Sequence, residues 1–317
     1  MLRSDLCLLL SVCLALASVC RGNARSAPKV EELFGAITTR FAEYEVIVEP
    51  DKDEPEWWAG APSVVRDRNG TFWFACRMRT ADAPRGLRGY EIRILRSDDG
   101  IRFSRVHSIR REDVPIGGFE RPALMIDPRT GRFKLYACGP WKDGPWSILK
   151  FADADEPTRF DPASARAVIT PLPKACDRDV IPGEYKDPFI LHAEGTYHCY
   201  VIGVMRRTER IYHFRSTDGE TWESVGSPYQ SIMDLTGWHD PVYNIGTGVG
   251  FTFDLHRIMD LTPESPLALS TTPSERFATW RYSHWMWVDG ELWVYAEVAR
   301  PNESNEVRLF RLPKQPR

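Results

Sequence analysis

Carboxylic acid side chains stand just before three prolines that open apolar, strand-like stretches. They occur in the segments Glu120-Arg121-Pro122, Lys186-Asp187-Pro188 and His239-Asp240-Pro241. Carboxyl groups that share one site can cleave a glycosidic bond, because one protonates the leaving oxygen while another acts as base or nucleophile. Crowding of like charges raises the pKa of one member, which then supplies the proton. The sequence therefore predicts catalytic roles for Glu120, Asp187 and Asp240, provided that the fold brings them together.

A repeated unit of four parts can bring together residues that are far apart in the sequence. Each unit has a proline-containing apolar strand, a glycine turn, an aromatic strand, and a third strand that turns through Ser-x-Asp-Gly-x-x-aromatic into a fourth. This last cassette is clear at 97–103 and 216–222 and degenerate at 152–160 and 270–277. Its Asp-Gly pair is typical of a turn and carries no predicted chemistry. A unit that recurs in fixed order indicates a repeat architecture.

Five such units can be counted, near 60–106, 119–162, 184–227, 238–281 and 282–313, and we number them one to five. Unit five lacks a fourth strand, which the N-terminal segment 44–49 can supply and so close a ring. Five four-stranded units predict an all-β chain folded as a five-bladed β-propeller. A β-sandwich is the alternative, but it does not explain four parts in fixed order. In a propeller Glu120, Asp187 and Asp240 would occupy equivalent entry positions around the axis.

The chain resembles the five-bladed propeller glycosidases of glycoside hydrolase families 43, 32, 62, 117 and 130. The resemblance covers about residues 45–313 and is carried by the Lys-Asp-Pro-Phe-Ile entry, the Glu-x-Pro entry and the Asp-Gly cassettes. It implies that Asp187 is a base or a carboxylate that tunes the transition state. It implies that Glu120 is the general acid and that Asp240 is a third member or binds a sugar hydroxyl.

The entry of unit one departs from that family pattern. The families usually carry an essential Asp there, whereas this chain has Gly60-Ala61-Pro62 and its nearest acid is the displaced Glu56. Two interpretations follow. Either another carboxylate serves as the base, or the propeller binds sugar without cutting it. A structural or partner-binding propeller is a third possibility.

Several residues near the entries are candidates for substrate binding. Trp57 and Trp58 can stack on a pyranose ring or pack the edge of unit one. Arg77 and Arg79 can hold carboxylated or sulfated sugars or form ordinary salt bridges. The remaining candidates are the neighbours of the predicted acids, which can instead form ion pairs with them: Arg121, Lys186 and His239.

Two further residues have a structural and a functional interpretation. His284, at the entry of unit five, resembles the axial histidine that family 43 enzymes use near a channel ion, although a satisfied core histidine is favoured. It is therefore a weak metal candidate. Glu297 is a reserve acid for which a structural role is favoured. No cofactor is required by the resemblance, and a structural cation in the central channel is compatible with it.

Composition narrows the classes of partner. The formal net charge of −3 does not suggest a nucleic-acid surface or a basic membrane-binding face. The seven Cys fit no zinc spacing, and Cys76, Cys138, Cys176 and Cys199 are expected as buried free thiols, with a disulfide as the alternative. A carbohydrate is the expected partner, and oligomeric state is not predicted.

The N-terminus predicts export. Residues 6–19 are apolar, follow Arg3 and end in small residues, which is typical of a secretory signal peptide; an uncleaved anchor is the alternative. We therefore expect a signal peptide at 1–22, a lead-in segment at 23–40 and one propeller domain at 41–317. The protein would be secreted or periplasmic, with no membrane attachment after cleavage of the signal.

Overall fold

The computed structural model describes residues 43–84, 86–173, 176–179, 181–193, 195–206, 209–226 and 280–312. Within these ranges the chain is all-β, and its helical turns are short 3-10 helices at Arg111–Asp113, Pro157–Arg159 and Pro162–Ser164. The predicted signal peptide, the lead-in segment and nearly all of unit four lie outside the described residues.

Units one to three each form a four-stranded antiparallel arrangement. Unit one contains β2 (Trp58–Arg66), β3 (Phe72–Arg79), β4 (Gly89–Ser97) and β5 (Ser104–Arg110). Unit two contains β6 (Ala123–Ile126), β7 (Phe133–Pro140), β8 (Trp146–Lys150) and β9 (Arg166–Ile169). Unit three contains β10 (Glu184–Ala193), β11 (Thr196–Val204), β12 (Glu209–Ser216) and β13 (Glu223–Gly226).

Strands from the two ends of the chain share a sheet. Unit five contains β14 (Trp280–Val288), β15 (Glu291–Ala299) and β16 (Asn305–Leu312). The segment β1 (Glu45–Val48) pairs antiparallel with β16, with Glu45 opposite Leu309. A single parallel bridge between Asn305 and Trp58 continues this sheet into unit one. The first described strand is thus the fourth strand beside unit five.

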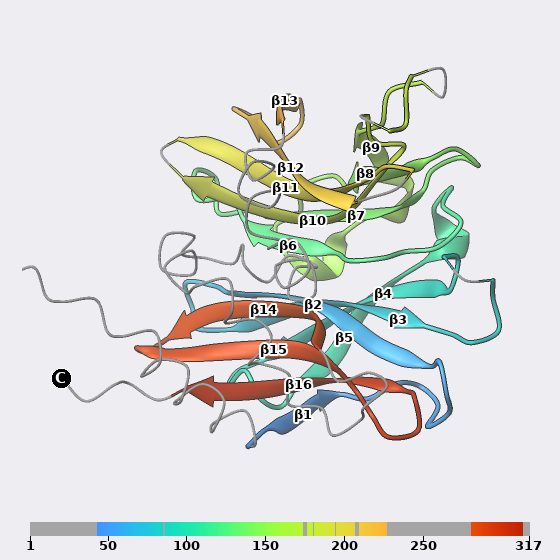
Figure 1. Ribbon diagram of the computed structural model, residues 1–317. Coiled ribbons are helices and arrows are strands. Elements are labelled where there is room, and N and C mark those ends of the chain that lie inside the picture. The colour runs from blue at the N-terminus through green and yellow to red at the C-terminus, as the bar shows by residue number, and fades with distance from the viewer. Residues whose placement is uncertain are drawn as a thin grey trace, which may run out of the picture.

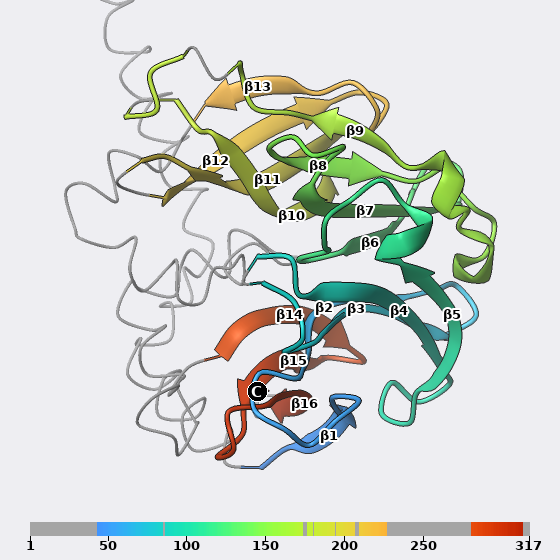
Figure 2. The ribbon, with the colours of Figure 1, turned by 90° about the vertical axis from the view of Figure 1, so that its right-hand side faces the viewer.

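The sheets fan out with their first strands inside, in a propeller-like arrangement. Strand β14 contacts β2, β2 contacts β6, and β6 contacts β10. Figures 1 and 2 show these strands toward the interior and β1, β5, β9 and β13 toward the outside. Such an arrangement gathers the starts of the first strands on one side of the molecule.

Apolar side chains between neighbouring sheets supply the core. One cluster lies between units five and one and includes Phe74 and Tyr295, and a second joins units one and two through residues such as Ile94 and Leu135. A third joins units two and three. Strand alternation places every second side chain on each face, so that each sheet packs against two neighbours.

The two clear Asp-Gly cassettes form the same turn. In the first, the Ser97 hydroxyl donates to Asp99 Oδ1 (2.8 Å), and the Gly100 N–H donates to Ser97 Oγ (2.9 Å). In the second, Ser216 donates to Asp218 (2.8 Å), and the Gly219 N–H donates to Ser216 (2.9 Å). Both glycines have positive φ, 73° and 75°. The predicted turns are therefore present with the side-chain caps that such turns favour.

Each clear cassette is also bonded to the preceding sheet. The Tyr295 hydroxyl of β15 donates to the Gly100 carbonyl (2.7 Å), and the Tyr136 hydroxyl of β7 donates to the Gly219 carbonyl (2.7 Å). Both tyrosines are fully buried. The cassettes thus join neighbouring sheets as well as turning the chain.

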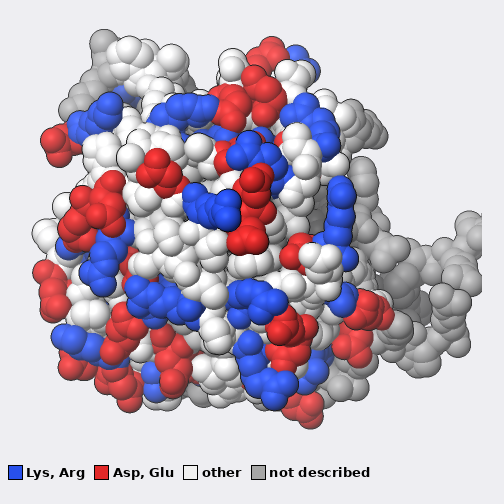
Figure 3. All heavy atoms as spheres, turned by 180° about the vertical axis from the view of Figure 1, so that it is seen from behind, with Lys and Arg blue, Asp and Glu red and all other residues white. Residues whose placement is uncertain are grey.

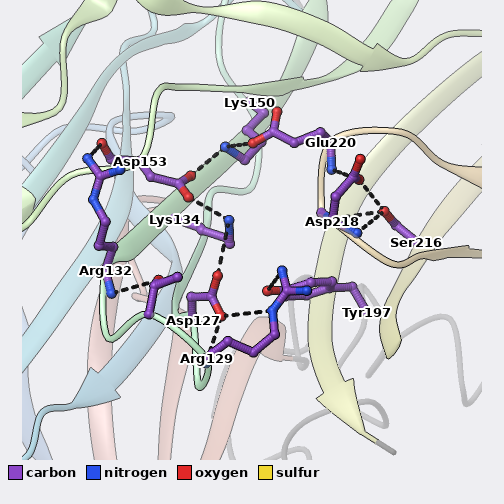
Figure 4. Close-up of polar contacts among 12 residues, drawn as sticks. Asp127, Arg129, Arg132, Lys134, Lys150, Asp153, Tyr197, Ser216, Asp218 and Glu220 are labelled. Atoms are coloured by element: carbon purple, nitrogen blue, oxygen red, sulfur yellow. Dashed lines mark hydrogen bonds and ion pairs between the residues drawn. The ribbon is translucent and has the colours of Figure 1, made fainter. Parts of the chain in front are cut away.

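Alternating charges connect units two and three on the side of the turns (Figure 4). Lys134 Nζ lies 2.5 Å from Asp153 Oδ2 and 3.4 Å from Asp127 Oδ2. Lys150 Nζ lies 2.5 Å from both Asp153 Oδ1 and Glu220 Oε1. Burial lowers the pKa of Lys150, and its bond to Asp153 opposes that shift. Because Glu220 belongs to the second cassette, these buried lysines attach that turn to unit two.

Unit two corrects one predicted boundary. The degenerate cassette at 152–160 does not form the tight turn of the other two, and the unit does not end near 162. Two 3-10 turns, at Pro157–Arg159 and Pro162–Ser164, delay the outer strand β9 to Arg166–Ile169. Proline at the start of each turn favours this compact detour, because its fixed φ suits the first position of a helix.

The surface shows no uniformly basic face in the view of Figure 3, where Lys and Arg alternate with Asp and Glu over the described residues. The described residues contain no helix that is long and apolar enough to cross a membrane. The cysteines at 76, 138, 176 and 199 are free, and all but Cys176 are buried, as the free-thiol interpretation predicts.

Candidate active site

The entries of units one and three share an unusual backbone. Ala61 has φ 51° and Asp187 has φ 54°, a left-handed conformation that costs a residue with a side chain roughly 1–3 kcal/mol. The strand register shifts at both places, between Gly60 and Ser63 and between Lys186 and Phe189. Ala61 and Asp187 therefore occupy the same position in the same type of bulge.

Glu120 is not equivalent to Asp187, so that prediction was wrong by one position. The residues that resume pairing after the entry prolines are Ser63, Ala123 and Phe189. Counting back from them, the position of Asp187 is taken by Ala61 in unit one and by Arg121 in unit two. Glu120 lies one residue earlier, at the position of Gly60 and Lys186. The error arose because the proline was used as an approximate marker.

Glu120 is nevertheless held at the centre of several units. Its side chain is 16% exposed and pairs with Arg77 of β3, which is fully buried. The Tyr282 hydroxyl of β14 donates to Glu120 Oε1 (2.9 Å), and the Glu120 N–H donates to the Cys138 carbonyl (2.9 Å). Residues from units one, two and five thus fix this carboxylate.

Asp187 lies close to the same group. It is 5% exposed, and its N–H donates to Cys138 Sγ (3.1 Å). Burial lowers the pKa of Arg121, and the negative charge of Asp187 opposes that shift. Burial raises the pKa of Tyr282 well above its usual value, and Asp187 adds to that shift. Tyr282 therefore interacts with both Glu120 and Asp187, and the fold brings these two predicted acids to one place.

Glu297 and its neighbours complete the polar cluster. The Ala61 N–H donates to Glu297 Oε2 (2.9 Å), Asn305 Nδ2 donates to Oε1 (2.7 Å), and Arg77 Nη2 lies 3.0 Å from Oε2. Glu297 is fully buried. Tyr282 and Asn305 were not predicted as site residues, because neither lies in a repeated motif, and only contacts between units identify them.

The predicted aromatic binders are covered by protein. Trp58 is 4% exposed, its Nε1 donates to the Glu303 carbonyl (3.2 Å), and the Arg79 guanidinium carbon lies 3.7 Å from its ring centroid. Trp57 is 9% exposed and has Lys52 Nζ 4.3 Å from its ring centroid. These contacts describe packing at the edge of unit one, and a sugar-stacking role for either ring stays a prediction.

Two other candidates have defined contacts. Lys186 Nζ lies 3.0 Å from Glu184 Oε2 and 4.6 Å from the centroid of the Trp146 ring. The displaced acid Glu56 pairs with Arg88. His239 and Asp240 lie outside the described residues.

His284 has the contacts of an interior histidine. Burial lowers its pKa to about 3, and the charge of Arg121 lowers it further. Its Nδ1 is buried without a hydrogen-bond partner among the described residues. However, no three His, Cys, Asp or Glu side chains gather to hold a metal ion in the described part of the chain. Those residues alone do not make a cation site.

A separate hollow lies beside the cluster, between units two and three. Its volume is about 1030 Å³, and its lining includes Asp143, Arg178, Glu184 and Arg206. Neither Glu120 nor Asp187 lines it. We place the candidate active site at the carboxylate cluster, because only that cluster combines several acids with cations from three units.

Comparisons with known proteins agree with this fold. No protein-family model and no curated protein matches the sequence. A solved structure described as "Glycoside hydrolase" has a TM-score of 0.59 at 12% identity, covering 92% of this chain and 97% of its own. A structure of BT0996 in complex with an RGII oligosaccharide has a TM-score of 0.58 at 11% identity, covering 91% and 96%.

A third structure extends the same pattern. A putative glycoside hydrolase from Parabacteroides distasonis ATCC 8503 has a TM-score of 0.52 at 13% identity, covering 86% of this chain and 97% of its own. At such low identity these matches establish the fold and no more. The chain therefore shares its fold with structures of glycoside hydrolases, which confirms the resemblance read from its repeats.

Proposed function

We propose that this protein is an exported glycoside hydrolase that cleaves an oligo- or polysaccharide at the mouth of a five-bladed propeller. The observation that carries the proposal is the meeting of Glu120 and Asp187 around Tyr282, on strands that belong to different units. Unit four would supply the remaining blade, with Asp240 and His239 at its entry. The pairing of β1 with β16 supports closure of the ring by the N-terminal strand.

In the proposed reaction, Glu120 gives its proton to the glycosidic oxygen while the bond to the anomeric carbon breaks. Asp187 acts as the base or as a carboxylate that stabilises the positive charge of the transition state. In the hydrolytic step, a water oxygen bonds to the anomeric carbon and its proton returns to a carboxylate. Asp240 would support this step or bind a sugar hydroxyl. Arg121 and Lys186 would contact substrate near the entries.

The substrate is expected to be a carbohydrate, as the shared fold supports. One similar structure is a complex with RGII, which makes RGII fragments reasonable members of a test panel. Export follows from the apolar segment 6–19. N-terminal sequencing of the protein recovered from the periplasm or medium tests it, and an intact Met1 would contradict cleavage.

The decisive assay compares the parent with Asp187→Asn and Glu120→Gln on a panel of oligosaccharides. Each substitution is expected to lower kcat by about 10²–10⁴-fold, the usual contribution of a positioned acid or base. Glu112→Gln is the matched control, because that carboxyl is 60% exposed and pairs with Arg111. Circular dichroism should show that all variants fold. Full activity of both site variants on a substrate that the parent cleaves would refute the assignment.

A non-catalytic carbohydrate-binding propeller is the second candidate. It is favoured by Ala61 at the position of Asp187, and by the ion pair that engages Glu120. This alternative predicts binding on a glycan array with no product after long incubation. Release of sugar by the parent, lost in Asp187→Asn, would exclude it.

A further inference from the structure

The space above Ala61 is filled by a carboxylate from another unit. Glu297 reaches over from β15 and accepts a hydrogen bond from the Ala61 N–H (2.9 Å). A Cβ added to Gly60 would lie 1.8 Å from Glu297 Oε2, so that glycine leaves the room that the carboxylate needs. The left-handed bulge at Ala61 presents its N–H to this group, whereas the matching N–H of Asp187 meets the sulfur of Cys138.

Both oxygens of Glu297 are occupied by donors. Oε1 accepts from Asn305 Nδ2 (2.7 Å) and from Arg77 Nη2 (3.2 Å), while Oε2 accepts from Arg77 Nη2 (3.0 Å) and from the Ala61 N–H. Hydrogen bonds of this number and kind hold a buried carboxylate in one orientation. Since Glu297 has no exposed surface, it does not reach substrate in this structure.

Arg77 connects Glu297 to Glu120. Its Nη2 binds Glu297 and its Nη1 pairs with Glu120, so one guanidinium lies between two carboxylates. The guanidinium carbon lies 5.3 Å from the ring centroid of Tyr282 and 5.8 Å from that of Trp58. These rings and the complete burial of Arg77 restrict its movement, so a change at Glu297 is transmitted to Glu120.

We propose that Glu297 is a positioning residue of the active site, which holds Arg77 and through it sets the position and charge balance of Glu120. This inference rests on the proposed role of Glu120 as the proton donor. Glu297 thus contributes a carboxylate from unit five at the place where unit one has none. The reserve acid of the sequence would act through another residue and not on the substrate.

The charges around Glu120 fix the direction of the effect. Arg77, Tyr282, Glu297, Asp187 and Arg121 are the ionisable side chains that meet there among the described residues. Arg77 shares one positive charge between two carboxylates. When Glu297 loses its charge, Arg77 stabilises the ionised form of Glu120 alone, and the repulsion between the two acids disappears. Glu120 then releases its proton at lower pH.

Glu297→Gln in the full chain tests the proposal in two ways. The alkaline limb of the kcat profile is expected to move down by about one pH unit, with KM changed less than about twofold, because Glu297 does not touch substrate. Carbon-13 NMR of glutamate-labelled protein should show the same shift in the titration of the Glu120 carboxyl, assigned with Glu120→Gln. Glu297→Asp retains the charge and should restore most of the parent profile.

Glu91→Gln is the matched control for the loss of a buried, arginine-bound carboxylate. Glu91 has no exposed surface and binds Arg93 and Arg105 in the outer part of unit one. It should lower stability without moving the Glu120 titration. If Glu297→Gln does not fold, Gly60→Ala displaces the carboxylate without changing charge. That variant should lower kcat at least about tenfold at nearly constant KM, since a small misplacement of a catalytic group has effects of this size.

The outcomes separate this inference from the proposed function. A parent that cleaves no sugar, together with a Glu120 titration that shifts in Glu297→Gln, would refute the hydrolase and retain the coupling. A parent that cleaves sugar, with an unchanged limb and an unchanged titration in Glu297→Gln, would overturn the role of Glu297. Unchanged kcat in Gly60→Ala would overturn it as well.

Discussion

The bonds between tyrosines and cassette glycines should measure how strongly neighbouring units hold together. Tyr136→Phe and Tyr295→Phe each remove one hydroxyl that donates to a buried carbonyl, at 2.7 Å in both cases. The ring and its packing remain, so only the hydrogen bond changes. An unsatisfied buried carbonyl costs about 1–3 kcal/mol. We therefore expect each variant to lower the free energy of unfolding by about 1–2 kcal/mol.

The two substitutions should add, because they lie at different interfaces. Tyr136 joins units two and three, while Tyr295 joins units five and one. Substitutions without shared partners usually add within about 0.5 kcal/mol. The double variant should thus lose about 2–4 kcal/mol, a large part of the ordinary 5–15 kcal/mol stability of a folded protein. Burial raises the pKa of both phenols far above neutrality, so the loss should not vary between pH 5 and 9.

Urea unfolding followed by tryptophan fluorescence measures these losses. The midpoint should fall while the slope stays constant, which would show that stability and not the extent of unfolding has changed. Tyr44→Phe is the matched control, because Tyr44 is 45% exposed. Losses below about 0.3 kcal/mol in both buried variants would refute the conclusion that the cassettes fasten the sheets, since that is less than an ordinary buried hydrogen bond contributes.

Three further predictions concern the buried polar groups. Arg77→Met should lower stability by about 3–5 kcal/mol in urea unfolding, because it leaves two carboxylates without their shared cation; a loss below about 1 kcal/mol would contradict the bridge. The pKa of His284 falls to about 3, so protonation is favoured in the unfolded state and stability should decline as pH falls from about 6.5 toward 3. His284→Gln should flatten that part of the pH–stability curve, and an unchanged curve would argue against burial. Burial raises the pKa of Cys76 to about 12, so thiol reagents followed by peptide mass mapping should label Cys176 in the native protein and leave Cys76 unlabelled until unfolding.

The sequence predicted most of the strands, because their signals are local. Glycine turns, entry prolines and alternating aromatic residues mark where a strand begins, ends and faces, whatever lies beside it. The cassettes at 97–103 and 216–222 are of this kind, since each turn is closed by its own serine and aspartate. The degenerate copy at 152–160 lacked that serine, and its chain makes 3-10 turns before β9.

The repeat itself also predicted that Glu120 and Asp187 would meet. The entries of successive units lie next to each other in any arrangement of this type, so acids near them converge. The one-residue offset between Glu120 and Asp187 followed from strand register, which depends on the bulge after each entry. A proline alone does not specify that register.

By itself, the sequence determined that the protein is built of repeated four-stranded sheets and which acids stand at their entries. Only the tertiary structure decided how those acids are held. Arg77, Tyr282 and Glu297 come from units one and five, and they meet Glu120 of unit two because of the way the sheets are staggered and twisted. Such contacts between units depend on the relative placement of whole sheets, and no spacing along the sequence records it. The space above Ala61, read in the sequence as a missing acid, is occupied by a carboxylate that reaches over from unit five.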